Sequence, residues 1–177
     1  MKVENIKKGL LRLLMPSVVI TIAYLIKFRA KVSPKAEVDF SPKLKLGKGC
    51  VIGSFTKVKA YDGPFIMGER GGIATNCFVA AGEGGIEIGD NFICGPNVSI
   101  VANNYVHAEM DVHLEDQGST SKGIKIGNNV WIGAGCVILD GAQIGDNSIV
   151  VANSTVNRRY RAGVIIQGSP AKVILKR

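Results

Sequence analysis

The sequence predicts an all-β solenoid of short stacked strands, preceded by a helical arm at the N-terminus. Two observations indicate this fold: an aliphatic residue recurs at every sixth position, and the residue after it is often glycine. In the second half of the chain the recurring positions are Ile126, Ile132, Ile138, Ile144, Val150 and Val156. A unit of six residues is too small to bury its own apolar side chain, so successive units have to stack on one another.

The first element is a basic, apolar arm over residues 1–31. It holds seven Lys/Arg and one acidic residue, so it carries +6 of the formal net charge of +8. Its uncharged stretch, residues 13–26, would reach only about 21 Å as a helix, short of the ~30 Å hydrocarbon core of a bilayer. We expect a helix that caps the open end of the solenoid or packs on a neighbouring subunit. The alternative is peripheral contact with an anionic membrane surface.

The solenoid is expected over residues 32–164. Its register slips near residues 59–66 and 80–87, where Gly and Pro indicate loops between faces. Glycine after the aliphatic residue is expected to supply backbone freedom at the bends, as are Asn91, Asn128 and Asn147. The fifth residue of each unit is small or β-branched and is predicted to pack in a corner. These residues are Cys50, Thr56, Cys77, Val98, Val130, Cys136, Ser148 and Ser154.

Composition agrees with a core of stacked aliphatic side chains, because 46% of the residues are hydrophobic and only 6% are aromatic. Three of the four cysteines occupy the fifth position, and Cys94 replaces an inward aliphatic residue. We therefore expect buried free thiols and a reducing environment. The protein is expected in the cytoplasm, either free or bound peripherally at the inner face of the cytoplasmic membrane. There is no basic face interleaved with aromatic residues, so a nucleic-acid partner is not expected.

One long break, over residues 101–125, interrupts the period between Ile100 and Ile126. It is rich in polar residues and contains both histidines of the chain, His107 and His113. A polar excursion from a rigid scaffold is where a functional site is expected. An imidazole, with a pKa near ~6.5, is suited to general base catalysis at neutral pH.

The repeat resembles the hexapeptide-repeat acyltransferases over roughly residues 32–173. The segment Ile126-Gly127-Asn128-Asn129-Val130-Trp131-Ile132-Gly133 is similar to a signature of the galactoside and maltose acetyltransferases. The resemblance implies a left-handed parallel β-helix with three hexapeptides in each triangular coil, assembled as a homotrimer. It also implies transfer of an acetyl group from acetyl-CoA to a sugar hydroxyl, with no metal ion.

The same resemblance assigns site residues. His107, nineteen residues before Ile126, is the expected catalytic base. Asn76, Asn104 and Tyr105 are expected to contact the acceptor. The expected cofactor residues are Gly133, Ala134, Ala152, Asn157, Arg158 and Lys172. The segment Gly168-Ser169-Pro170-Ala171-Lys172-Val173-Ile174 resembles a terminal element of the family that turns the chain back, within a tail over residues 165–177.

Two other interpretations stay open. The segment Gln117–Lys122 resembles surface-polysaccharide O-acetyltransferases, which carry histidine where Tyr105 stands here. That branch suggests a lipid-linked or polysaccharide acceptor, and the exchange of Tyr105 and His107 leaves room for a non-catalytic member of the family. The second alternative is a metal-dependent enzyme resembling the γ-class carbonic anhydrases. The alternating residues His107, Glu109, Asp111 and His113 would share one face of an extended strand.

Overall fold

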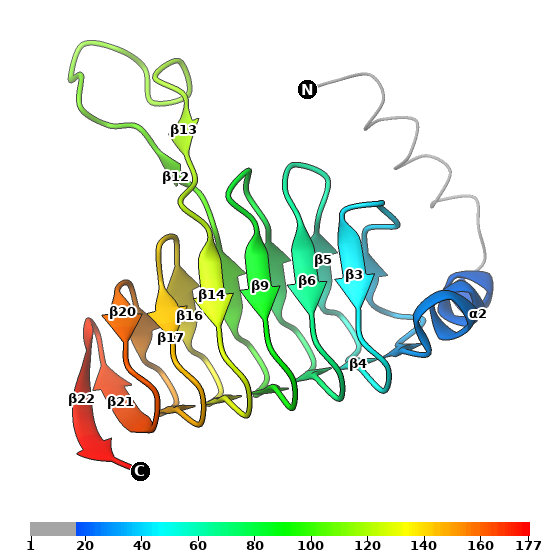
Figure 1. Cartoon of the computed structure of the whole chain (residues 1–177). Helices are drawn as coiled ribbons and strands as arrows, with labels where there is room; N and C mark the ends of the chain where they lie inside the picture. The colour runs from blue at the N-terminus through cyan, green and yellow to red at the C-terminus, as the bar shows by residue number, and fades with distance from the viewer. Residues whose placement is uncertain (1–16) are drawn as a thin grey trace.

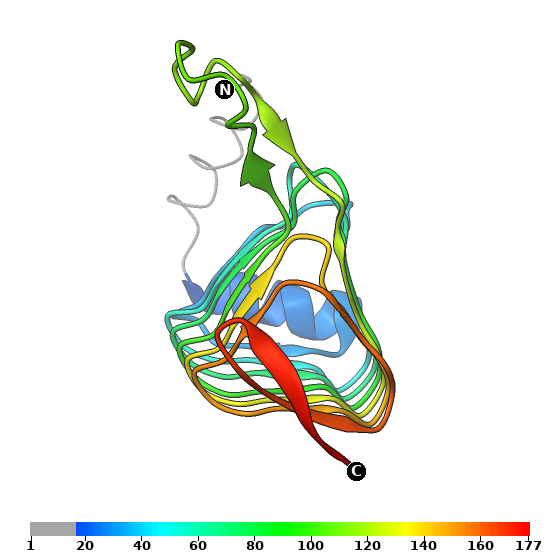
Figure 2. The same ribbon diagram turned by 90° about the vertical axis from the view of Figure 1, so that its left-hand side faces the viewer.

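The computed structural model describes residues 17–177, in which the chain winds through three parallel sheets in turn and forms a three-sided solenoid (Figures 1 and 2). Short strands with buried, alternating side chains build the coils, and the helix α2 (Ser17–Phe28) precedes them. The predicted mostly-β fold with an N-terminal helix is therefore confirmed. None of the helical segments within residues 17–177 is long and apolar enough to cross a membrane.

Each coil contributes one strand to each of three sheets, which we call A, B and C in the order the chain visits them. Sheet A contains β1 (Lys31–Val32), β4 (Val51–Ile52), β7 (Gly72–Ile73), β10 (Ile93–Cys94), β15 (Trp131–Ile132), β18 (Ile149–Val150), β21 (Val164–Gly168) and β22 (Ala171–Lys176). Sheet B contains β2 (Glu37–Val38), β5 (Lys57–Lys59), β8 (Phe78–Ala80), β11 (Ser99–Val101), β16 (Val137–Leu139) and β19 (Thr155–Val156). Sheet C contains β3 (Leu44–Leu46), β6 (Phe65–Met67), β9 (Ile86–Ile88), β14 (Ile124–Ile126), β17 (Gln143–Ile144) and β20 (Arg159–Tyr160).

Parallel register stacks the inward side chains in columns. In sheet A, Val32 pairs with Ile52, which pairs with Ile73, and the same column continues through Cys94. Every position of the six-residue period is at most 6% exposed, from Val32 to Val156. The fifth-position residues are equally buried, at 0–2% exposure, so both sequence predictions about the core are confirmed.

The coils turn at three corners, named A–B, B–C and C–A after the sheets they join. At the A–B corner, left-handed backbone recurs with φ between 57° and 69° at Phe55, Asn76, Asn97, Gly135 and Asn153. At the C–A corner it recurs with φ between 53° and 79° at Gly49, Arg70, Asn91, Asn129, Asn147 and Gly163. Arg29, between α2 and β1, has the same conformation with φ of 53°. The prediction for Asn128 was wrong, because the left-handed residue is its neighbour Asn129. Asn128 instead accepts the Asp90 backbone N–H through its side chain, at 2.8 Å.

The glycine after each inward aliphatic residue has a steric role that the sequence interpretation missed. These glycines do not have positive φ. A Cβ at Gly133 would lie 2.5 Å from the Ala152 nitrogen, and one at Gly53 would lie 2.7 Å from the Ala74 carbonyl carbon. Glycine therefore lets the backbone of one coil approach that of the next.

All four cysteines are free and buried, as predicted. Burial raises the pKa of the Cys50 and Cys136 thiols above the ordinary value. A contact with the Cys77 thiol, together with burial, raises the pKa of Cys94. The thiols of Cys50, Cys94 and Cys136 are therefore poor nucleophiles at neutral pH. The hydrogen bond with Cys94 instead lowers the pKa of Cys77 to about 7, but this thiol is buried, with only 2% of the residue exposed.

The helix α2 covers the open N-terminal end of the solenoid, in line with the capping alternative (Figures 1 and 2). Tyr24 is fully buried and donates its hydroxyl to the Val38 carbonyl at 2.9 Å, and its ring contacts Phe28 and Phe40. Thr21 donates to the Val32 carbonyl at 3.0 Å. Residues 1–16 of the predicted arm lie outside the described residues.

At the other end, β21 extends sheet A and β22 folds back against it as an antiparallel strand. The turn falls at residues 168–171, where the Ser169–Pro170 peptide bond is cis, so the predicted reversal of the chain is confirmed. The Ala171 carbonyl accepts hydrogen bonds from the Tyr160 hydroxyl (2.7 Å) and the Arg158 guanidinium (3.0 Å). These contacts fix the closing hairpin on the last coil.

Candidate active site

The excursion at residues 101–125 leaves the solenoid at the B–C corner, between β11 and β14 (Figures 1 and 2). Its stem is an antiparallel pair, β12 (Asn104–Tyr105) with β13 (Ser119–Thr120). Asn104 pairs with Thr120, and Tyr105 pairs with Ser119. The stem carries the tip of the excursion away from the coils.

The base of the excursion is tied to neighbouring coils on both sides. The Ser121 hydroxyl makes a short hydrogen bond to the Ala102 carbonyl and accepts the Gly84 N–H at 2.8 Å. The carboxylate of Asp140, which is buried, accepts the N–H groups of Lys122 (2.8 Å) and Gly123 (2.9 Å). These bonds hold both strands of the stem where they leave the solenoid.

The tip is held by the side-chain amide of Gln117. Its oxygen accepts the Glu109 N–H at 3.0 Å, and its nitrogen donates to the carbonyls of Glu109 and Val112, each at 2.8 Å. Gln117 thereby replaces a backbone strand partner within the loop. Gln117, Ser121 and Asp140 were not among the predicted site residues. The resemblance of segment 117–122 to a second branch of the family was the signal that pointed to two of them.

His107 lies just after β12 with its ring exposed, and its Nδ1 is 3.2 Å from the Tyr105 carbonyl oxygen. When Nδ1 carries the proton, it donates to this carbonyl, and Nε2 then presents a lone pair to solvent. Asn104, Tyr105 and His107 thus lie on one short segment. All three side chains are exposed and accessible to an acceptor.

The alternating residues His107, Glu109, Asp111 and His113 do not form the single face that a metal site would need. The chain turns at residues 110–112 and again at 114–117 instead of continuing as a strand. In the described part of the chain, no group of three or more His, Cys, Asp or Glu side chains could hold a metal ion.

A groove of about 550 Å³ lies where sheet A meets the A–B corner. Its lining comprises Gly95, Pro96, Trp131, Gly133, Ala134, Ile149, Val150, Val151 and Ala152. Three of the predicted cofactor residues are among them, and Trp131 points outward beside them with half of its surface exposed. The groove is therefore apolar, with small residues along its floor.

Two backbone amides of this groove are available to a ligand. The Gly133 N–H donates to the Val150 carbonyl at 2.8 Å, so it is occupied. Within residues 17–177, the amides of Ala134 and Ala152 donate to no protein acceptor. The equivalent backbone N–H groups of two earlier coils, at Ser54 and Thr75, also have no acceptor within residues 17–177. The side chains of Ser54 and Thr75, however, are larger than alanine and stand beside the N–H group. The methyl side chains of Ala134 and Ala152 leave the amide open to a ligand.

The remaining predicted cofactor residues fall in two places. Lys172 pairs with Gln167 at the end of β21, which lies beside β18, and Ala152 follows β18, so Lys172 lies at the groove end of sheet A. Asn157 and Arg158 follow β19 at the B–C corner, at the far end of that strand. The Arg158 guanidinium is bonded to the Tyr160 hydroxyl (3.2 Å) and the Ala171 carbonyl.

Asn76 lies on the same A–B edge as the groove, toward the N-terminal end. It is a left-handed corner residue with φ of 57°, and its side-chain nitrogen donates to Asn97 at 2.7 Å. In a single chain the groove and His107 are not brought together. The excursion leaves the B–C corner, which is opposite sheet A (Figure 2). The groove lies along sheet A, at its A–B edge.

Residues 123–158 match the family model described as bacterial transferase hexapeptide (six repeats). The resemblance to the hexapeptide-repeat acyltransferases that the sequence predicted is therefore confirmed. Among the curated relatives, the chain is similar to galactoside O-acetyltransferase of Escherichia coli (strain K12), with 42% identity over 90 residues. That alignment covers 50% of this chain and 43% of the relative. The chain spans under half the length of the first curated relatives it matches.

Solved structures of acyltransferases are also similar to this chain. A galactoside acetyltransferase in complex with coenzyme A is 29% identical, with a TM-score of 0.62, and the match covers 92% of this chain and 72% of that one. A mutant of AntD, an N-acyltransferase from Bacillus cereus in complex with dTDP and coenzyme A, has a TM-score of 0.76 at 22% identity. That match covers 88% of each chain and shows likeness of fold.

Proposed function

We propose that this chain is an acetyltransferase that moves an acetyl group from acetyl-CoA to a sugar hydroxyl. The observation that supports it most is the groove beside Trp131, where the N–H groups of Ala134 and Ala152 have no acceptor within residues 17–177 and the side chains are small. A thioester with a long, thin pantetheine arm fits such a groove. The similarity to a galactoside acetyltransferase with bound coenzyme A points to the same ligand.

In this proposal the amides of Ala134 and Ala152 bind the arm and the thioester oxygen. An amide donor that meets the developing oxyanion contributes roughly 3 kcal/mol to the barrier reduction. Gly133 keeps the floor of the groove low, because any Cβ there would collide with the next coil. Lys172 contacts the nucleotide phosphates of coenzyme A. Asn157 and Arg158, at the C-terminal end of the solenoid, also contribute to binding the cofactor.

His107 acts as the general base. Its Nε2 accepts the proton of the acceptor hydroxyl while the oxygen attacks the thioester carbonyl. The C–O bond forms, the C–S bond breaks, and the proton passes to the leaving thiolate to give free coenzyme A. Asn104 and Tyr105 position the acceptor, with Asn76 at the corner edge. Transfer is direct, since all four cysteines are buried.

A complete site needs two copies of the chain, because the excursion and the groove lie on different sides of one copy. We propose a homotrimer of left-handed solenoids in which the excursion of one subunit reaches the groove of the next. The exposed apolar residues of the excursion support this packing. Met110 is fully exposed, and Leu114 and Tyr105 are more than half exposed.

The test is release of coenzyme A thiol from acetyl-CoA, followed with a thiol reagent against a panel of sugars, sugar nucleotides and amino sugars. The proposal predicts acceptor-dependent thiol release and an O-acetylated sugar by mass spectrometry. Transfer confined to amino groups would overturn the hydroxyl assignment. If no acceptor in the panel raised thiol release above the rate with protein alone, the proposed activity would be contradicted.

A further inference from the structure

The helix α2 is apolar on two opposite sides. Its inner side packs on the first coil through Tyr24, with Ile20 and Phe28 partly buried against the core. Its outer side carries five large apolar residues, each with an exposed fraction between 45% and 78%. These are Val18, Val19, Ile22, Leu25 and Ile26. A helix that is apolar all round is normally covered on all sides, so the outer side calls for a partner.

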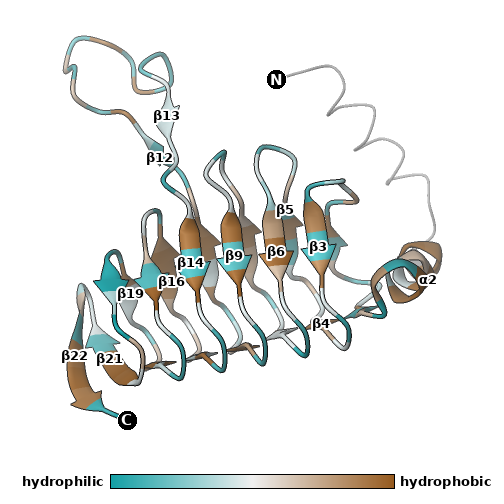
Figure 3. Ribbon diagram, in the orientation of Figure 1, coloured by the Kyte–Doolittle hydropathy of each residue, from teal (hydrophilic) through white to brown (hydrophobic). Residues whose placement is uncertain are grey.

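The outer residues form one continuous stripe. Residues 18, 22 and 25, and likewise 19, 22 and 26, are three or four positions apart and so lie on the same side of a helix. Two aromatic side chains of the first two coils, Phe40 (52% exposed) and Phe55 (61% exposed), add exposed apolar surface at the same end of the solenoid. Figure 3 shows the apolar colour over much of α2. Apolar patches of this kind mark interaction sites.

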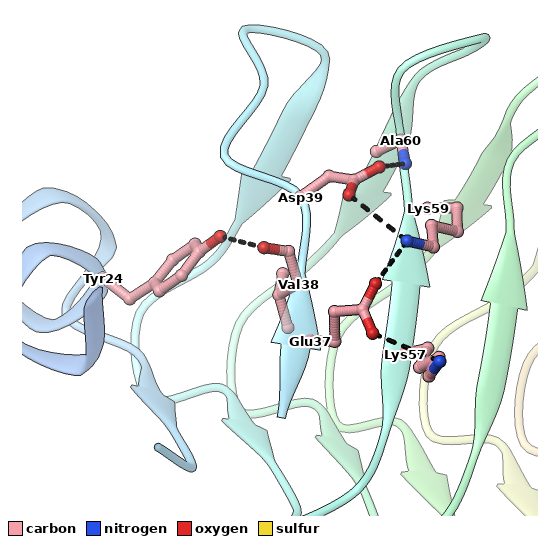
Figure 4. A network of polar contacts seen from close by, with 7 residues as sticks. All are labelled: Tyr24, Glu37, Val38, Asp39, Lys57, Lys59 and Ala60. Carbon is pink, nitrogen blue, oxygen red and sulfur yellow. Dashed lines mark hydrogen bonds and ion pairs between the residues drawn. The ribbon is translucent and has the colours of Figure 1, made fainter. Parts of the chain in front are cut away.

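Several cationic groups lie at the same end of the molecule as this stripe. The Lys27 ammonium lies 4.5 Å from the centre of the Phe40 ring, and the Lys35 ammonium lies 5.5 Å from that of Phe55. Arg29 and Lys31 are exposed at the end of the helix. The acidic Glu37 and Asp39 of the first coil are paired with Lys57 and Lys59, so they do not offset this charge (Figure 4).

We infer that the outer face of α2 docks on an anionic lipid surface. An interfacial helix binds membranes by burying an apolar stripe while basic residues meet anionic headgroups. Residues 1–31 carry +6 of the net charge of +8, so the charge is concentrated at this end of the chain. The described basic residues at this end, Lys27, Arg29, Lys31 and Lys35, disfavour a second copy docked end to end, because like charges repel each other.

The helix lies across the N-terminal end of the solenoid (Figures 1 and 2). Its outer side therefore points along the solenoid axis, away from the coils. A membrane bound there leaves the outer surfaces of all three sheets and the excursion uncovered. This inference does not depend on the proposed function, since it concerns a surface that the proposed site does not use.

The test is sedimentation of the full-length protein with vesicles of phosphatidylcholine containing phosphatidylglycerol, compared with phosphatidylcholine alone. We expect binding to the anionic vesicles only, and weaker binding at high salt, which screens the charges. The double variant Ile22→Glu/Ile26→Glu should lower the partition coefficient by at least about tenfold. The matched control is Ile174→Glu in β22, at the opposite end of the solenoid, where the isoleucine is 48% exposed. It should bind like the wild type.

Circular dichroism and thermal unfolding establish that the double variant is folded, and Ile22→Ser/Ile26→Ser is the milder replacement if it is not. Equal binding to neutral vesicles would overturn the proposal, as would full binding by the folded double variant. Failure of the wild-type protein to bind anionic vesicles would also overturn it. Self-association of the wild type that the double variant abolishes would identify a second copy as the partner instead.

Discussion

The proposed role of His107 as a general base depends on one contact. The Tyr105 carbonyl beside Nδ1 favours the tautomer in which Nε2 is the free base. A histidine general base contributes ~10²–10⁴-fold to turnover, so His107→Ala should lower kcat by that factor. Acceptor-dependent thiol release measures this. The control is His113→Ala, in the same exposed loop, which should keep wild-type turnover. A loss at His113 with none at His107 would reverse the assignment.

In the proposed site, the small side chain of Ala152 leaves the groove open to acetyl-CoA. The side chain is exposed, so Ala152→Trp is compatible with folding but fills the space beside the open amide. We expect the KM for acetyl-CoA to rise by at least about tenfold, or turnover to be lost, because binding energy for the pantetheine arm is removed. Ser54→Trp is the control, at the equivalent corner position of an earlier coil outside the groove. An unchanged KM in Ala152→Trp would mean that the cofactor binds elsewhere.

At the scale of elements, the excursion is held by the buried carboxylate of Asp140. Asp140→Ala leaves the N–H groups of Lys122 and Gly123 without an acceptor, and an unsatisfied buried donor costs about 1–3 kcal/mol. We expect a loss of that size in the free energy of unfolding in urea, with faster proteolysis within residues 102–123. Asp140→Asn keeps one acceptor oxygen and should lose less. Unchanged stability and unchanged proteolysis in Asp140→Ala would show that the base is held by other contacts.

The strand pair β2–β5 carries the ion pairs of Glu37 with Lys59 (2.5 Å) and Lys57 (3.2 Å). The hydrogen bond from Lys59 holds the pKa of Glu37 below its ordinary value of 4.5. A carboxyl group with a lowered folded-state pKa stabilises the fold above its unfolded pKa, and this stability is lost as the pH falls through the folded pKa. Because the pair is partly exposed, we expect Glu37→Gln to cost only about 0.5 kcal/mol at pH 7. Denaturant unfolding at a series of pH values should show this difference shrinking toward acid pH, and a difference that grew toward acid pH would contradict the assignment.

Sequence reasoning succeeded for elements whose position follows from the six-residue period. The inward column and the fifth-position residues are buried because each coil repeats the same geometry. It failed where side-chain identity has two explanations. Glycine after the aliphatic residue suggested backbone freedom, but the next coil approaches too closely for a Cβ. The left-handed corner residue is Asn129 and not Asn128. The sequence could not distinguish them, because the two neighbouring asparagines fit the pattern equally well.

At the scale of the whole molecule, the sequence was least informative about how the parts of the site are arranged in space. The predicted residues Gly133, Ala134 and Ala152 do line one groove, and Asn104, Tyr105 and His107 do share one loop. Their separation on different sides of the solenoid follows from the corner at which the excursion leaves. No spacing in the sequence gives that corner directly. Asp140 could not be predicted either, because its role depends on a contact between successive coils.

The central claim is that one subunit supplies His107 and its neighbour supplies the groove. Mixing two inactive variants tests it most directly: His107→Ala and Ala152→Trp are co-expressed with different tags, and the hybrid oligomers are purified through both. In a mixed trimer of either composition, one of the three shared sites combines an intact loop with an intact groove, so about one third of wild-type activity should return. Hybrid oligomers that remained as inactive as either variant alone would contradict a site shared between subunits.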